Sequence, residues 1–278
     1  MNLLVNRMLK NPWVQCPQLP EVEKVIQSIS VKNYYRGSNM AKKRLNDLEH
    51  TYRQWIFDIA DLSEFENFYF VNGVTDAINQ WVATEDRPWQ FFSGDYEYAN
   101  MISGTGKKID KIDKIITDHI LYVSNPACST GNFIELNNLD IPILLDCSYI
   151  GSTNKQKITI PKSTEQVWFS FSKGWGLVGQ RMGIVFSKKP HKSLEPMKRV
   201  EAWNYTSVEI AHAILENFNI DTVYNLYKPL QEKICNEMQL TPADCFFIAN
   251  SNDEIYKIRR RVGNIARLDL SYAMNMGI

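Results

Sequence analysis

The chain has 278 residues, 44% of them hydrophobic, which is enough to bury a sizeable core in one large domain or two smaller ones. A composition of this kind excludes a disordered or fibrous protein. Lys and Arg together number 31, and so do Asp and Glu, so the formal net charge is zero. No overall field therefore attracts nucleic acid or an anionic membrane, and we expect neither as a partner.

Targeting and metal-binding patterns are both missing from the sequence. The N-terminal stretch MNLLVNRMLKNPW lacks the apolar core and the small-residue cleavage site of a signal peptide. No apolar run approaches the roughly 20 residues of a membrane-spanning helix, so we expect the protein to stay in the cytoplasm. Five cysteines without a CxxC pair and four scattered histidines fit neither a disulfide framework nor a zinc site. We expect reduced cysteines and no bound metal.

In chain order, the hydrophobic pattern predicts two helices and then an alternation of strands and helices. Pro20, followed by two glutamates, begins a short helix, and residues 39–61 form one long amphipathic helix. From about residue 66, short runs rich in Phe, Tyr, Val and Ile alternate with amphipathic stretches, which is typical of an α/β domain. The strands predicted in this part are 67–71, 90–93, 120–124, 142–146, 166–171 and 182–187. After residue 190 the pattern is helical until strand-like runs at 245–249 and 264–271, which indicate a second, smaller domain.

The strongest functional signal lies in residues 169–186, FSFSKGWGLVGQRMGIVF. Strand alternation places Ser170 and Ser172 on the same face, and Lys173 follows them in a glycine-rich turn. Arg181 then opens the next predicted strand. A lysine amine captures an aldehyde as a Schiff base, while hydroxyls and a guanidinium bind phosphate oxygens. An isolated Ser-x-Ser-Lys is usually a surface turn, but the glycines and the arginine favour a site for an aldehyde cofactor that carries a phosphate.

This segment resembles the active-site lysine motif of fold type I pyridoxal-phosphate (PLP) enzymes, the class I/II aminotransferases. The resemblance implies that Lys173 binds the cofactor PLP as a Schiff base, and that the phosphate of PLP binds Ser170, Ser172 and Arg181. It also implies an α/β fold with a three-layer α/β/α large domain around a mostly parallel sheet, and a small α+β domain. We expect residues 34–216 to form the large domain, and residues 1–33 with 217–278 to form the small one.

A candidate carboxylate for the cofactor lies in residues 142–151, PILLDCSYIG, where a buried strand ends in Asp146 and Tyr149 follows. A buried carboxylate needs a cationic partner, or it takes up a proton. In the family, an aspartate in this pattern keeps the pyridine nitrogen of PLP protonated, and the tyrosine reaches the phenolic oxygen of the ring. The resemblance assigns these roles to Asp146 and Tyr149, which join Lys173 as candidate catalytic residues. The alternative is an aspartate that only caps a turn.

A candidate phosphate-binding turn lies in residues 69–78, YFVNGVTDAI, where a strand runs through Gly73 into a helix that begins near Thr75. Backbone N–H groups at the start of a helix bind phosphate well. The resemblance assigns this contact to Val74 through its amide, and to Thr75 through its amide or hydroxyl. The alternative is an ordinary helix start with Thr75 as the N-cap.

A candidate stacking ring follows the next strand, in SGDYEYAN at 93–100. A flat aromatic side chain at this place can stack on the pyridine ring and hold it in plane. The resemblance assigns the position to Tyr96, with Tyr98 as a rival. Either tyrosine could equally be an aromatic residue of the core.

One loop departs from the family pattern. Residues 122–133, YVSNPACSTGNF, align with the family's NPNNPTG loop, whose second-block asparagine bonds to the phenolic oxygen of the cofactor. Here that position is Cys128, and Ser129 replaces the following proline. Because a thiol is a poor substitute for an amide donor, we expect Cys128 to lie at the cofactor with one hydrogen bond lost.

The expected substrate contact is an arginine near the C-terminus. The segment GNIARLDLSYA places Arg267 in an alternating strand, where family members bind the substrate's carboxylate or phosphate with an arginine. Residues 259–261, which are all arginines, are competitors for this role, and a solvated face is the alternative reading of that cluster.

The N-terminal part adds two expectations from the same resemblance. Residues 11–17, NPWVQCP, resemble the loop that lies over the substrate in the histidinol-phosphate aminotransferase branch and its threonine-phosphate decarboxylase relatives, which makes Trp13 a candidate substrate contact. Tyr34, with Tyr35 as a near alternative, falls where the family offers a tyrosine to the phosphate in the partner subunit. We therefore expect a homodimer with shared active sites.

The resemblance implies transamination between an amino acid or amino-phosphate donor and a 2-oxo acid acceptor. Decarboxylation or elimination with the same cofactor needs the same lysine and aspartate, so a decarboxylase or lyase is an alternative. A shortened, non-catalytic protein of this fold is a third, which the short chain and Cys128 leave open. The glycine-rich segment GTGKKID at 104–110 lacks the spacing of a nucleotide-binding P-loop, and we expect a polar turn there.

Overall fold

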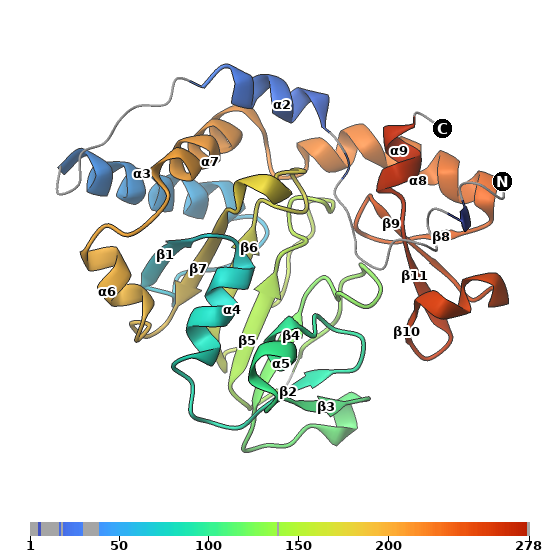
Figure 1. The fold of residues 1–278 in the computed structure, drawn as a ribbon, viewed down its shortest axis with the longest axis horizontal. Coiled ribbons are helices and arrows are strands. Elements are labelled where there is room, and N and C mark those ends of the chain that lie inside the picture. The colour runs from blue at the N-terminus through green and yellow to red at the C-terminus, as the bar shows by residue number, and fades with distance from the viewer. Residues whose placement is uncertain (1–4, 7–16, 18, 30–38, 138, 277–278) are drawn as a thin grey trace.

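The structure of the protein is a computed structural model that describes residues 5–6, 17, 19–29, 39–137 and 139–276. Trp13, Tyr34 and Tyr35, three candidates for the site, lie outside these residues. The chain forms a large α/β unit and, beside it, a smaller unit that its C-terminal part builds (Figure 1). Within the described ranges, no helix combines the length and the apolarity that crossing a membrane requires.

The large unit is built on a seven-stranded sheet with the strand order β1-β7-β6-β5-β4-β2-β3. Strand β7 is antiparallel to β1 and β6, and all other neighbouring pairs are parallel. The strands are β1 (Asn67–Val71), β2 (Trp89–Phe92), β3 (Lys107–Ile109), β4 (Ile120–Ser124), β5 (Ile143–Cys147), β6 (Thr164–Ser170) and β7 (Gly183–Ser187). The residues of β4, β5 and β7 are all buried, as expected of a sheet that helices cover on both faces.

Helices pack on both faces of this sheet. They are α3 (Asn39–Ile56), α4 (Val74–Val82), α5 (Tyr98–Ser103), α6 (Leu194–Arg199) and α7 (Tyr205–Asn217), and α2 (Pro20–Gln27) packs on α7. Helices α3 and α7 share a hydrophobic cluster with Phe169 of β6, whereas Trp81 of α4 shares another with Trp168. Successive residues of a strand point to opposite faces, so these two neighbours on β6 enter different clusters. The three-layer α/β/α arrangement is therefore confirmed.

The smaller unit holds a four-stranded sheet with the order β10-β11-β9-β8. Its elements are α8 (Thr222–Met238), β8 (Thr241–Pro242), β9 (Ile248–Ser251), η3 (Glu254–Arg259), β10 (Arg260–Val262), β11 (Ile265–Asp269) and α9 (Ser271–Asn275). Leu268 of β11 and Ile248 of β9 belong to the same hydrophobic cluster as the α3 face of the large sheet. The two units therefore share one continuous core, and β11 is held close to the large sheet.

Two predicted elements differ in detail. The long helix ends at Ile56 and not near residue 61, because the N–H of Ile59 bonds to the carbonyl of Ile56 in a turn. The segment 104–110, expected to be a polar turn, contains β3, an edge strand that pairs with β2. Two of its three residues are exposed lysines, so the strand has no apolar alternation that the sequence could show.

A third difference concerns the strand predicted at 245–249, which begins at Ile248. Residues 245–247 are completely buried, which makes the sequence look like a strand. They form a turn instead, because the N–H of Ile248 bonds to the carbonyl of Cys245.

Candidate active site

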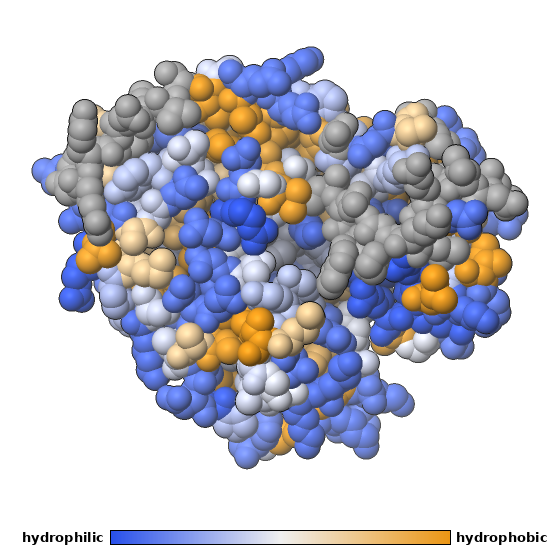
Figure 2. Space-filling view, viewed as in Figure 1, coloured by the Kyte–Doolittle hydropathy of each residue, from blue (hydrophilic) through white to orange (hydrophobic). Residues whose placement is uncertain are grey.

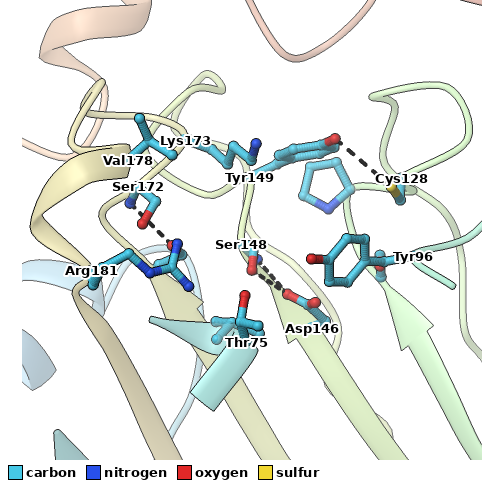
Figure 3. Close-up of a pocket in the computed structure, with 14 residues that line it drawn as sticks. Thr75, Tyr96, Cys128, Asp146, Ser148, Tyr149, Ser172, Lys173, Val178 and Arg181 are labelled. Atoms are coloured by element: carbon cyan, nitrogen blue, oxygen red, sulfur yellow. Dashed lines mark hydrogen bonds between the residues drawn. The ribbon is translucent and has the colours of Figure 1, made fainter. Parts of the chain in front are cut away.

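A cavity of about 130 Å³, partly open to solvent, lies at the carboxyl ends of the central strands (Figure 3). This edge of an open α/β sheet is where ligands bind. Ten of the residues predicted from the sequence line the cavity: Val74, Thr75, Tyr96, Cys128, Asp146, Tyr149, Ser170, Ser172, Lys173 and Arg181.

Lys173 enters the cavity from the turn that follows β6 (Figure 3). This turn packs tightly on the turn after β5, since a Cβ on Gly174 would lie 2.6 Å from the carbonyl carbon of Gly151. Only a glycine fits such a close approach of two backbones. The packing fixes the lysine beside the segment that carries Asp146 and Tyr149.

Arg181 and Lys173 lie on opposite sides of Ser172 (Figure 3). The two serine side chains are buried, and the N–H of Ser172 donates to Ser170 Oγ at 3.0 Å. Arg181 does not open the next strand, which begins at Gly183, but precedes it in a left-handed conformation with φ 50°. Such a conformation is costly for a residue with a side chain. It directs the guanidinium to the start of α4, where a Cβ on Gly73 would meet Arg181 Nη2 at 2.9 Å.

The start of α4 closes this end of the cavity. The helix begins at Val74 with Gly73 as its N-cap and without a side-chain cap, so Thr75 is not the N-cap. The carbonyl of Gly73 accepts from the N–H of Asp76, so the amides of Val74 and Thr75 precede the first bond of the helix. Those amides, together with Arg181, form a positive end that suits a phosphate group.

Asp146 is 3% exposed and receives three hydrogen bonds, all from uncharged donors. Tyr122 Oη lies 2.6 Å from it, and the N–H and hydroxyl of Ser148 lie at 2.9 and 2.5 Å. Burial raises the pKa of Asp146 above its ordinary value, and the bonds from Ser148 and Tyr122 oppose that rise. A cation in the cavity would therefore stabilise the ionised carboxylate. Ser148 was not singled out from the sequence, although an Asp two residues before a Ser is the signal for such a turn.

Arg267 of β11 does not line the cavity, but it contacts two residues that do. Its side chain is buried, and Nη1 donates to the carbonyl of Cys128, to Cys128 Sγ at 3.2 Å and to Tyr149 Oη at 3.5 Å. Cys128 Sγ and Tyr149 Oη are themselves 3.9 Å apart. Three residues predicted from distant parts of the chain thus form one cluster. Its competitor Arg260 forms an ion pair with Glu254.

Tyr96 lies at the same cavity, near the start of α4. Burial raises its pKa, and a hydrogen bond with Thr75 opposes that rise. Tyr98 stacks on Tyr96 with ring centroids 6.0 Å apart, but its hydroxyl donates to Asn79 of α4. Tyr98 is therefore a support for Tyr96 and does not itself line the cavity.

No protein-family model and no curated protein matches the sequence. Solved structures do match. An aminotransferase from Mycobacterium tuberculosis is 14% identical with a TM-score of 0.65, over 97% of this chain and 93% of that one. A histidinol-phosphate aminotransferase from Sinorhizobium meliloti, in complex with pyridoxal-5'-phosphate, is 14% identical with a TM-score of 0.61, over 94% and 87%.

A third similar structure is the L-threonine-O-3-phosphate decarboxylase from Porphyromonas gingivalis. It is 16% identical with a TM-score of 0.58, over 89% of this chain and 97% of that one. Matches at these identities establish the architecture and not the reaction, and they span nearly the full length of both chains. The chain therefore has the fold of the fold type I aminotransferases and their decarboxylase relatives.

Proposed function

We propose that the protein binds PLP and catalyses transamination. One observation carries the proposal: a lysine, a buried carboxylate and the start of helix α4 line the same cavity. Each of these parts of the cavity matches one group of PLP. Lys173 suits the aldehyde, Asp146 the ring nitrogen, and Arg181 with the amides at α4 the phosphate.

When bound, PLP would supply an electron sink for bonds broken at the substrate's Cα. Lys173 Nζ would accept the proton from that Cα and later return it, as general base and acid. Asp146 would hold a positive charge at the inner end of the cavity. Tyr96 would restrain the ring, and Tyr149 would donate to its phenolic oxygen. Ser170 and Ser172 would add hydroxyl donors to the phosphate site.

We expect Arg267→Ala to weaken substrate capture while leaving the affinity for PLP intact, because Arg267 contacts Cys128 and Tyr149 but does not itself line the cavity with Arg181 and the start of α4. Loss of a charged, two-pronged contact should raise the free-energy barrier in kcat/KM by roughly 2–4 kcal/mol. Steady-state kinetics with a PLP titration would measure both quantities. Arg260→Ala is the matched control, and an equal loss there with a harmless Arg267→Ala would show that Arg267 does not bind substrate.

We also expect Cys128→Asn to tighten PLP binding by about 1 kcal/mol, the usual net worth of one added hydrogen bond. Cys128 lines the cavity beside Tyr149, so an amide there gains a donor toward the phenolic oxygen of the ring. Equilibrium titration of wild type and variant with PLP would test this. Cys147→Asn is no control because Cys147 is fully buried, so Cys128→Ala, which adds no donor, serves as one. Equal affinity in Cys128→Asn and Cys128→Ala would mean that residue 128 does not face the ring.

The reaction itself needs a direct assay, since a decarboxylase or lyase could use the same lysine and aspartate. Purified protein with PLP would be incubated with an amino acid or amino-phosphate donor and 2-oxoglutarate. Transamination predicts a new 2-oxo acid and glutamate, whereas carbon dioxide or free ammonia would favour the alternatives. Protein that binds no PLP would instead favour a non-catalytic member of the fold, the alternative that Cys128 leaves open.

We propose a homodimer with shared active sites, with Tyr34 of one subunit serving the phosphate site of the other. An apolar surface area over α5, next to the cavity, supports the proposed dimer (Figure 2). Met101 and Ile102 of that helix are 70% and 44% exposed. Sedimentation of wild type against a Met101→Glu variant would test the assembly.

We also propose that residues 34–216 form a large domain and that both chain ends together form a small one.

A further inference from the structure

A second carboxylate, Asp95, is buried close to the cavity without lining it. It follows β2 and is 6% exposed. Its oxygens accept the N–H of Ser124 at 2.9 Å, the hydroxyl of Ser124 at 2.5 Å and the N–H of Tyr96 at 2.7 Å. All three donors are uncharged. Asp95 therefore holds two cavity-lining residues in place from behind.

The bond to Ser124 connects Asp95 to the aspartate at the inner end of the cavity. Ser124 is the last residue of β4, and its register partner in β5 is Asp146. The two strands are joined there, since the N–H of Asn125 donates to the carbonyl of Asp146. Tyr122, two residues before Ser124 and on the same face, donates to Asp146. Asp95 and Asp146 thus lie on the same side of the sheet, with β4 between β2 and β5.

The charges of the two carboxylates act on each other and on the cavity. Burial raises the pKa of Asp95 to about 6, its hydrogen bonds from Ser124 and Tyr96 oppose this, and Asp146 adds to the rise. The pKa of Tyr122 is raised by burial and then by Asp146 and Asp95, as expected for a phenol beside both. Among the described residues, every hydrogen-bond donor that reaches either carboxylate is neutral. Two buried negative charges would therefore both be stabilised by one cation in the cavity.

We infer that Asp95 is a positioning residue for the cofactor: its carboxylate reinforces the negative charge that faces the ring nitrogen, and it holds Ser124 and Tyr96 at the ring. This rests on the proposed function, because the cation is the protonated ring nitrogen of PLP. The role is electrostatic as well as structural. The effect of replacing Asp95 on ligand affinity should therefore depend on whether the ligand has a ring nitrogen. The effect of replacing a purely structural residue would not.

The test compares two ligands that differ at one atom, PLP and its carbocyclic analogue, in which C–H replaces the ring nitrogen. Dissociation constants of both would be measured for wild type and Asp95→Asn by calorimetry or fluorescence. We expect Asp95→Asn to bind PLP about five- to tenfold more weakly, from the loss of one charge at short range in a buried site. Its affinity for the analogue, whose ring carries no positive charge, should stay the same or rise.

Two controls separate charge from structure. Ser124→Ala removes the hydroxyl bond that opposes the rise in the pKa of Asp95, so the affinities are compared at a pH well above 6, where the carboxylate stays ionised. The ratio of the two affinities should then remain that of wild type. Asp244→Asn removes a part-buried carboxylate that accepts the N–H of Phe133 and does not line the cavity. It should leave both affinities unchanged. Asp95→Ser is the second neutral variant, used if thermal unfolding shows that Asp95→Asn does not fold.

The possible failures are distinguishable. Equal weakening of both ligands in Asp95→Asn, or no weakening of either, would overturn the inference and leave the proposed function standing. Wild-type protein that binds neither ligand would overturn the proposed function, and the inference with it.

Discussion

Lys173→Ala is expected to lower the rate of amino transfer by up to about 10⁴-fold, the upper range for the loss of a general acid and base. The lysine lines the cavity on a turn whose close packing fixes its direction, so no other described lysine can take its place there. The variant should still bind PLP through the phosphate site, because Arg181 and the start of α4 are untouched. Kinetics and a PLP titration of the same preparation would show both effects.

Reduction with borohydride tests the same residue without an activity assay. After reduction of the PLP-loaded protein and peptide mapping, the label should be found on Lys173 and should be absent from Lys173→Ala. Lys188→Ala is the matched control, because Lys188 forms an ion pair with Glu64 and does not line the cavity. A label on another lysine of the wild type would refute the proposed site.

Asp146→Asn is expected to lower turnover on the order of a thousandfold, as for other lost electrostatic partners in closed sites. The amide keeps the size of the side chain but cannot hold the positive charge of the ring nitrogen. Folding should be affected far less, because burial already raises the pKa of Asp146 and makes its ionised form costly. An active Asp146→Asn enzyme would show that Asp146 only caps the turn to Ser148.

The pH dependence of unfolding without PLP is a second readout for this carboxylate. Burial raises the folded-state pKa of Asp146, and that of Asp95 to about 6. For an acid with a raised folded-state pKa, the contribution to stability is fully present below the unfolded-state pKa of about 3.9. It is lost as pH rises through the folded-state value. The contribution of these two carboxylates to the free energy of unfolding should therefore fall as pH rises from about 4 to above 6. Burial lowers the pKa of His191 to about 4 and also lowers that of His212, which acts in the opposite direction over this range. The difference between the unfolding curves of wild type and Asp146→Asn isolates the Asp146 part.

Local sequence was sufficient for the parts of the site that lie on one short segment. Strand alternation predicts that Ser170 and Ser172 share a face, and both line the cavity. The apolar run before Asp146 predicts a buried strand end, and the carboxylate is buried there. The α/β class followed from the alternation of element types, because each strand and helix carries its own hydrophobic period. These features depend on residues within a few positions of each other.

Features that depend on contacts between distant segments appeared only in the tertiary structure. The pairing of β1 with β7, the contact of Arg267 with Cys128, and the bonds from Ser124 to Asp95 each join residues far apart in the chain. The hydrophobic periodicity of a segment does not specify which strands are neighbours in the sheet. Asp95 in particular looked like an ordinary loop aspartate, because its charge matters only once β4 has placed Ser124 between it and Asp146. The sequence by itself thus determined the types of side chain at the site, whereas the strand order decided which of them act together.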